Sequence, residues 1–154
     1  DYCSSVYHHC TKTDAQNLER IQKRFLRYVQ LDFQSSYSDV LISSNQVTLY
    51  ERRSKIILEN VFKIQNDSLP PVECTLFSRS QTGYNMRRDN VLVHARFRNM
   101  YGLRSMRVLG PKLWNELPND LRVCEDYFQF KERLKKWHSH CQCNCCLMCS
   151  LKLI

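Results

Sequence analysis

The chain has 154 residues, 43% of them hydrophobic and 25% charged, and its formal net charge is +8. This composition is typical of a folded domain, and the length allows one ordinary core but not comfortably two. Three glycines and four prolines favour long helices over a turn-rich β sandwich. No apolar run approaches the roughly 20 residues of a membrane span, and no secretory signal opens the chain. We therefore expect an intracellular protein, nuclear or cytoplasmic, that is not secreted.

Two long helices are predicted in the first half. The first, residues 14–31, begins after Thr13 as its N-cap. Its apolar stripe recurs at helical spacing and consists of Leu18, Ile21, Phe25 and Tyr28 or Val29. The second, residues 48–65, has a wider apolar stripe, which predicts burial on more than one side. A Ser-rich polar connector, residues 34–45, separates the two helices, and we expect them to pack on each other.

The second half predicts a small β hairpin and two further helices. Residues 91–96 alternate in polarity, Tyr101-Gly102 supplies a turn, and residues 104–108 form the returning strand. Gly110-Pro111 opens a short helix that Pro118 closes, and within it Trp114 is interpreted as a core anchor rather than a stacking surface. A last helix, residues 126–138, places its apolar side chains on one face and covers the bundle. The fold class is therefore mainly α, a helical bundle with a small β hairpin.

A Cys-rich irregular tail, residues 138–154, follows the predicted helical domain of residues 1–137. Five of the nine cysteines crowd into it, and Cys146-x-x-Cys149 has a spacing found in zinc sites. The possible zinc ligands are Cys141, Cys143, Cys146 and Cys149. Lipid attachment at these cysteines is a second interpretation, and an unselected tail of a decayed element is a third, which we prefer.

Five short segments carry a recognisable pattern. They are Tyr2-Cys3-Ser4-Ser5-Val6, Leu18-Glu19-Arg20-Ile21-Gln22-Lys23-Arg24-Phe25, Leu49-Tyr50-Glu51-Arg52-Arg53, Gly110-Pro111-Lys112-Leu113-Trp114-Asn115-Glu116-Leu117-Pro118 and Phe130-Lys131-Glu132-Arg133-Leu134-Lys135. In this order and spacing they resemble the region after the polymerase core in non-LTR, jockey-like retrotransposon reverse transcriptases. The likeness covers about residues 1–137. It departs from the family at Tyr7, where Trp is more frequent, and it does not include the tail.

The resemblance implies a thumb and post-polymerase segment of an RNA-directed DNA polymerase, a fragment that begins within an element. It implies that an upstream reverse transcriptase core is a partner, and that the catalytic aspartates and their magnesium ions lie in that core. The residues themselves also argue against catalysis, because paired metals need clustered carboxylates. The one adjacent acidic pair, Glu125-Asp126, precedes a helix and is interpreted as compensation of its dipole.

Positive charge is concentrated in one segment, and all of it is arginine. Residues 79–107 contain seven arginines and one acidic residue, Asp89. The arginines are Arg79, Arg87, Arg88, Arg96, Arg98, Arg104 and Arg107. Arginine pairs with phosphate through two parallel hydrogen bonds and stacks on bases, and Tyr84, Phe97 and Tyr101 among them could stack on unpaired bases. We therefore expect this segment to contact template RNA or target DNA.

Three other interpretations stay open. The arginines could lie on a solvated hairpin and meet acidic surfaces elsewhere in the parent protein. The chain could be an orphan remnant of a decayed element without activity. It could also be a basic adaptor that binds a protein through the Cys-rich tail.

Overall fold

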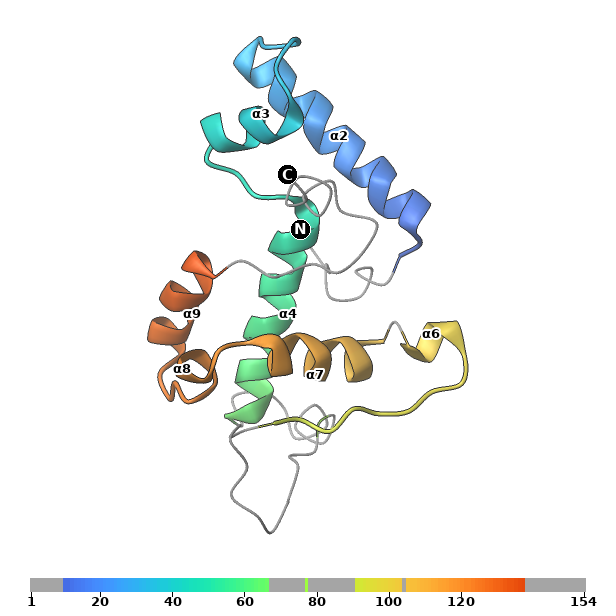
Figure 1. Ribbon diagram of the computed structural model, residues 1–154, viewed down its shortest axis with the longest axis vertical. Coiled ribbons are helices and arrows are strands. Elements are labelled where there is room, and N and C mark those ends of the chain that lie inside the picture. The colour runs from blue at the N-terminus through green and yellow to red at the C-terminus, as the bar shows by residue number, and fades with distance from the viewer. Residues whose placement is uncertain (1–9, 67–76, 78–90, 104, 138–154) are drawn as a thin grey trace. The chain divides into compact units, whose positions relative to one another are not determined.

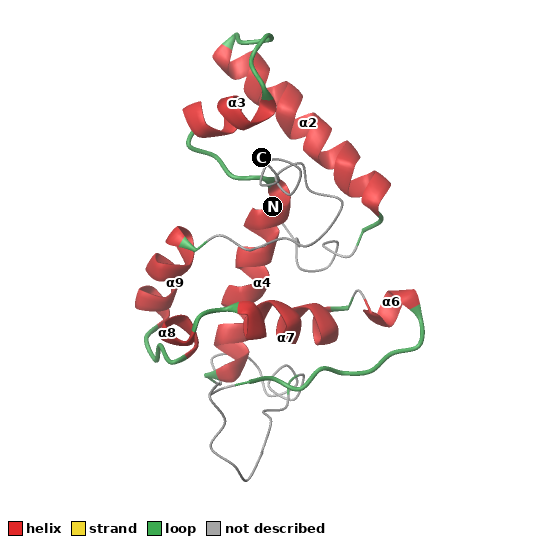
Figure 2. Ribbon diagram, in the orientation of Figure 1, coloured by secondary structure: helices red, strands yellow, loops and turns green. Residues whose placement is uncertain are grey.

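The computed structural model describes residues 10–66, 77, 91–103 and 105–137 (Figure 1). These residues are mainly helical, and none of them lies in a β strand (Figure 2). They fall into two compact units, which we name the α2–α3 unit, up to Arg53, and the α4–α9 unit, from Ser54 on. The boundary falls inside helix α4 (Leu49–Gln65). That residues 1–137 form one domain stays a prediction.

Helix α2 (Lys12–Gln30) is the long helix that periodicity predicted. Its N-cap is Thr11 rather than Thr13, because the Thr11 hydroxyl accepts a hydrogen bond from the Asp14 amide at 3.2 Å. The helix ends at Leu31, which adopts a left-handed conformation with φ of 53° and donates its N–H to the carbonyls of Arg27 and Tyr28.

Helix α3 (Tyr37–Ser43) occupies the predicted polar connector, which is therefore not irregular. Ser36 begins it by accepting a hydrogen bond from the Asp39 amide. A small cluster of buried side chains joins α2 to α3 and consists of Leu26, Tyr37, Val40 and Leu41. The Ser-rich sequence hid this helix because only three residues of a short element are buried.

Glu19 ties α2 to the elements that follow it. Its carboxylate accepts a hydrogen bond from the Tyr37 hydroxyl at 2.6 Å and another from the Leu49 amide at 3.2 Å, at the start of α4. Burial, followed by this contact with Glu19, raises the pKa of Tyr37. Thr48 caps the start of α4 by accepting a hydrogen bond from the Glu51 amide. The first turn of α4 is thereby held to α2.

The face of α2 that the sequence assigned to the core is exposed. Ile21, Phe25, Tyr28 and Val29 are all largely open to solvent, whereas Leu26 is buried against α3. Helix α2 carries apolar residues on two adjacent faces, and periodicity alone could not say which of them is covered.

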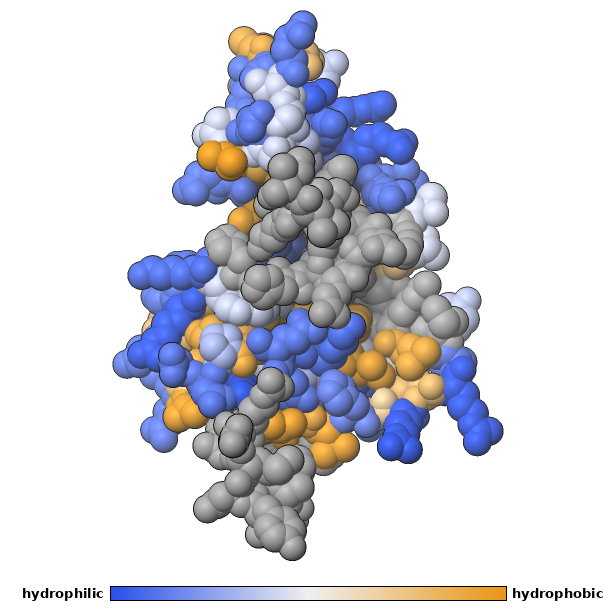
Figure 3. All heavy atoms as spheres, viewed as in Figure 1, coloured by the Kyte–Doolittle hydropathy of each residue, from blue (hydrophilic) through white to orange (hydrophobic). Residues whose placement is uncertain are grey.

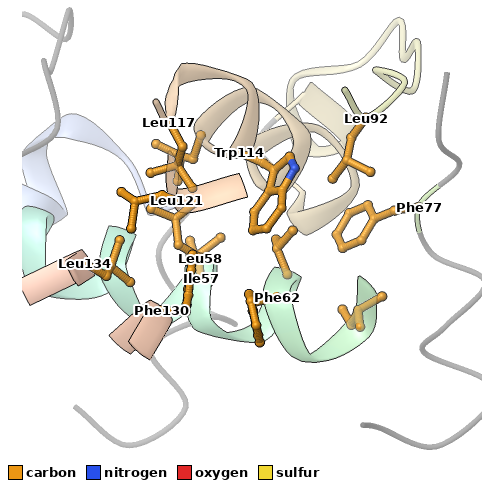
Figure 4. Close-up of a cluster of buried hydrophobic side chains, with 13 residues drawn as sticks. Ile57, Leu58, Phe62, Phe77, Leu92, Trp114, Leu117, Leu121, Phe130 and Leu134 are labelled. Atoms are coloured by element: carbon orange, nitrogen blue, oxygen red, sulfur yellow. The ribbon is translucent and has the colours of Figure 1, made fainter. Parts of the chain in front are cut away.

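The α4–α9 unit is organised around one aromatic and aliphatic core (Figure 4). Helix α4 contributes Ile57, Leu58, Val61, Phe62 and Ile64, so the predicted burial on a broad face is confirmed. Helix α7 (Met106–Glu116), helix α8 (Asn119–Arg122) and helix α9 (Tyr127–Lys136) supply most of the rest. The Phe62 and Phe130 rings stack at 4.3 Å between centroids, and Trp114 lies 6.0 Å from Phe130. Trp114 is thus a core anchor, as predicted.

The predicted β hairpin is wrong. Helix α6 (Met100–Leu103) and the first turn of α7 occupy the predicted turn and returning strand. Asn99 caps α6 by accepting the Gly102 amide at 2.7 Å, and the Ser105 carbonyl accepts the amides of Val108 and Leu109. The backbone amides of Gly102, Val108 and Leu109 therefore form hydrogen bonds within their own helical turns rather than with a neighbouring strand.

Helix α7 begins several residues before the predicted Gly110-Pro111 start. Gly110 lies against the core, where a Cβ atom would come within 2.9 Å of Phe77 and 3.1 Å of Val61. A larger residue would push α7 away from α4 at this point. Helix α9 begins at Tyr127, and Asp126 of the acidic pair is its N-cap, because its carboxylate accepts the Gln129 amide at 2.9 Å. None of the helices within the described ranges is long and apolar enough to span a bilayer.

The core assignment predicts a large difference between two phenylalanines of α9. Phe130 is 0% exposed and Phe128 is 74% exposed. Phe130→Ala should lower the free energy of unfolding by about 3–5 kcal/mol, because it leaves a cavity beside Phe62 and Trp114. Phe128→Ala, the matched control, should change it by less than about 0.5 kcal/mol. Urea denaturation measures both, and equal losses would contradict the assignment.

The end of α2 predicts a stabilising substitution. Leu31 is 80% exposed and left-handed, a conformation that costs a residue with a Cβ atom about 1–2 kcal/mol. Leu31→Gly should raise the free energy of unfolding by about 1 kcal/mol. Leu31→Ala keeps the Cβ atom and should gain nothing. Thermal unfolding of the three proteins checks this, and a gain with alanine would refute the backbone explanation.

Candidate nucleic-acid interface

The structure describes four of the nine residues predicted to bind nucleic acid. Arg96, Arg98, Arg107 and Tyr101 all lie in the α4–α9 unit, and all are exposed. The other five lie outside the described residues; they are Arg79, Tyr84, Arg87, Arg88 and Arg104. The proposed zinc ligands Cys141, Cys143, Cys146 and Cys149 lie outside them too, so the zinc site stays a prediction.

An amide side chain fixes the segment that carries Arg96 and Arg98. Asn115 of α7 accepts the Leu92 amide at 3.0 Å through Oδ1 and donates to the Leu92 carbonyl at 2.9 Å through Nδ2. The Leu92 side chain, meanwhile, enters the core. Nδ2 also lies 3.2 Å from Nε2 of His94, which accepts a hydrogen bond from it in the tautomer that carries its proton on Nδ1. The chain therefore leaves the core at a fixed point, and the two arginines follow it on the surface.

A tight turn presents Tyr101 to solvent. Gly102 packs on Phe97, and a Cβ atom at Gly102 would come within 2.6 Å of the Cβ and Cγ atoms of that side chain. The Ser105 hydroxyl donates to the Gly102 carbonyl at 2.6 Å and closes the end of α6. Tyr101, next in the chain to this crowded glycine, is 82% exposed. Phe97 is partly buried, so of the two aromatic residues described in the arginine-rich segment it is Tyr101 that offers an open face to a base.

The segment that carries these residues is positively charged because it contains no acidic residue. Residues 91–115 contain no aspartate or glutamate, while they contain Arg96, Arg98, Arg107 and Lys112 among the described side chains. All four of these are exposed. A stretch of chain that carries cations and no carboxylate of its own attracts phosphate. The next acid in the sequence is Glu116, which is exposed on α7 one turn after Lys112. We name these four residues and Tyr101 the basic surface.

Lys112 is the member of the basic surface that sequence reasoning missed. It lies on α7, beyond the arginine-rich stretch that ends at Arg107. The predicted short helix that contains it, from Gly110 to Pro118, was interpreted only through its core residues. Its exposure could have been inferred from the helical spacing, because the buried neighbours Leu113 and Leu117 place it on the opposite face.

A concave feature outside the basic surface lies between α8 and α9. It is an open groove of about 900 Å³, lined by Asn119, Asp120, Val123, Cys124, Glu125, Asp126, Gln129 and Arg133. Its polar groups largely serve the fold: Asp126 caps α9, and Arg133 donates to the Asp120 carbonyl at 3.2 Å. Among the described residues, no group of three or more metal-ligating side chains converges, here or elsewhere.

Comparison with known proteins adds no relative to this picture. No protein-family model matches the chain, and no curated protein or solved structure matches it either. The resemblance to reverse transcriptases therefore rests on the five sequence segments alone. The support for the basic surface comes from its described residues.

Proposed function

We propose that this chain is a non-catalytic distal segment of a retrotransposon reverse transcriptase. It supports the polymerase core and contacts template RNA or target DNA. The observation that carries the binding part is the basic surface, where four exposed cations and an exposed tyrosine come from one stretch of chain, residues 91–115, that contains no carboxylate. The polymerase part rests on the resemblance. An in-frame polymerase core with clustered aspartates, encoded upstream of Asp1 in the transcript, is the observation that would support it.

The chemistry of the basic surface fits a single strand with at least one unpaired base. Guanidinium groups hold the phosphate backbone without reading sequence, while an open phenol ring stacks on any base. Leu92 and Asn115 hold the segment to the core, so binding requires little ordering of the backbone. Proteins of this kind bind single strands with strong salt dependence and weak sequence preference.

The phosphate contacts predict a defined change in salt dependence. Each lost contact to a single strand should reduce the slope of log K against log salt by about 0.7, so Arg96→Gln with Arg98→Gln should reduce it by about 1.4. The measurement is fluorescence anisotropy of a labelled oligonucleotide across a salt series. The matched control is Arg20→Gln with Arg24→Gln, which removes the same charge from exposed positions of α2. Equal effects of the two pairs would mean that only net charge matters, and a salt-insensitive wild type would overturn the proposal.

The stacking role of Tyr101 predicts a difference between single strands and duplexes. Tyr101→Ala should weaken binding of a single-stranded oligonucleotide by about 1–3 kcal/mol and leave duplex binding nearly unchanged. Tyr101→Phe keeps the ring and should bind as the wild type does. A loss with phenylalanine as large as that with alanine would assign the effect to the hydroxyl group instead. Tyr101 is exposed, so neither substitution should disturb the fold.

A further inference from the structure

The exposed apolar face of α2 is a second surface, independent of the nucleic-acid proposal. Ile21, Phe25, Tyr28 and Val29 are between 64% and 68% exposed and lie along one side of the helix. Phe33 extends this face, because its ring meets that of Tyr28 edge to face at 5.4 Å between centroids. Single exposed apolar residues are ordinary, but a continuous stripe of large ones marks an interaction surface. We name these five residues the α2 stripe. The face of this unit seen in Figure 3 is largely hydrophilic, with a few apolar groups at its upper end and beside α3.

The helix that carries the α2 stripe is held firmly by its neighbours. At one border of the stripe Gln22 donates to the Val47 carbonyl at 3.1 Å, and away from the stripe Arg27 donates to the Ser35 carbonyl at 2.7 Å. Gln30 donates to the Ser43 hydroxyl at 2.8 Å, and Glu19 accepts from Tyr37. The stripe is therefore presented on a preformed helix, and a partner would not have to order it on binding.

The spacing of the α2 stripe suits another helix. Ile21, Phe25 and Tyr28 are separated by four and then three residues, the alternation by which two helices interlock their side chains. Leu18 precedes Ile21 by three residues and continues the same alternation. A partner helix with its own apolar residues at this spacing would fit side chain between side chain.

The charges along the two edges of the α2 stripe indicate which charges the partner helix should carry. Arg20 and Arg24 are exposed and lie one turn apart along one edge of the stripe. The other edge carries the uncharged Gln22 and turns towards α3. A partner helix would match this pattern with acidic side chains along one edge only.

The charged residues of α2 argue against two other occupants of the stripe. Arg24 disfavours a second copy of the chain, and Asp14 disfavours a lipid surface. Two α2 helices packed antiparallel across Ile21 and Phe25 would bring Arg24 against its own copy, which is repulsive. Asp14 lies two turns before Ile21 on the same face, where a bilayer would have to bury its carboxylate. An aqueous protein partner meets neither difficulty.

We propose that the α2 stripe binds an amphipathic α-helix of a protein partner, one that carries Asp or Glu along a single edge of its apolar face. The Arg20 and Arg24 edge sets the orientation of this helix, and the stripe supplies the buried contact.

The test uses two synthetic peptides of about 20 residues, long enough to be helical, with Leu at the contact positions. One peptide carries Glu along one edge and the other carries Lys, and they are otherwise identical. The full chain should bind the Glu peptide about five- to ten-fold more tightly than the Lys peptide. Arg20→Glu with Arg24→Glu should reverse this preference, which a non-specific apolar contact would not do.

Matched variants separate the stripe from the rest of the unit. Ile21→Ser with Phe25→Ser should abolish binding of both peptides, while Ile42→Ser, at a 79% exposed position of α3 outside the stripe, should not. Circular dichroism should show unchanged helix content, because the replaced side chains are exposed. Three results would overturn the proposal: no preference between the peptides in the wild type, a dimer in sedimentation that Ile21→Ser with Phe25→Ser dissolves, or binding to phosphatidylserine vesicles that the same pair removes.

Discussion

The contact of Phe130 with Phe62 and Trp114 is the constraint on which the α4–α9 unit depends. It joins three helices at one point, with stacked rings 4.3 Å apart and an indole beside them. Trp114 is followed directly by Asn115, so anchoring the indole also aims the amide that holds the Leu92 backbone. The position of the basic surface is therefore a consequence of the aromatic core, although no member of the core belongs to that surface.

The long helices could be predicted because each buries a stripe that repeats at helical spacing. The broad face of α4 followed from local residues and was confirmed. The acidic pair before α9 was interpreted only as dipole compensation, and the structure shows in addition that Asp126 caps the helix. The covered side of α2 could not be predicted. Leu26 and Phe25 are adjacent apolar residues on neighbouring faces, and only the position of α3 decides that Leu26 is the buried one. Helix α3 was itself missed, because its capping serine resembles a loop residue.

The basic surface was predicted in its charges but not in its shape. The alternation around residues 91–96 indicated a strand, and one backbone segment there does form paired hydrogen bonds. The Leu92 amide and carbonyl pair with the side chain of Asn115, and an amide side chain leaves no trace in a periodic pattern. The exposure of Tyr101 depends likewise on the close approach of Gly102 to Phe97, a contact between residues whose types alone do not reveal it.

Both proposed surfaces contain exposed arginines, but the arginines have different proposed roles. The net charge of +8 does not distinguish these roles. Arg96 and Arg98 lie in a segment without acids that also carries an open aromatic ring, Tyr101, and such a setting suits a polyanion that can stack. Arg20 and Arg24 border a row of large apolar side chains, and their charge would select the orientation of a partner whose affinity comes from apolar burial. The neighbours of an arginine, more than its charge, therefore decide which partner it can recognise, and each unit of this chain supplies a different set of neighbours.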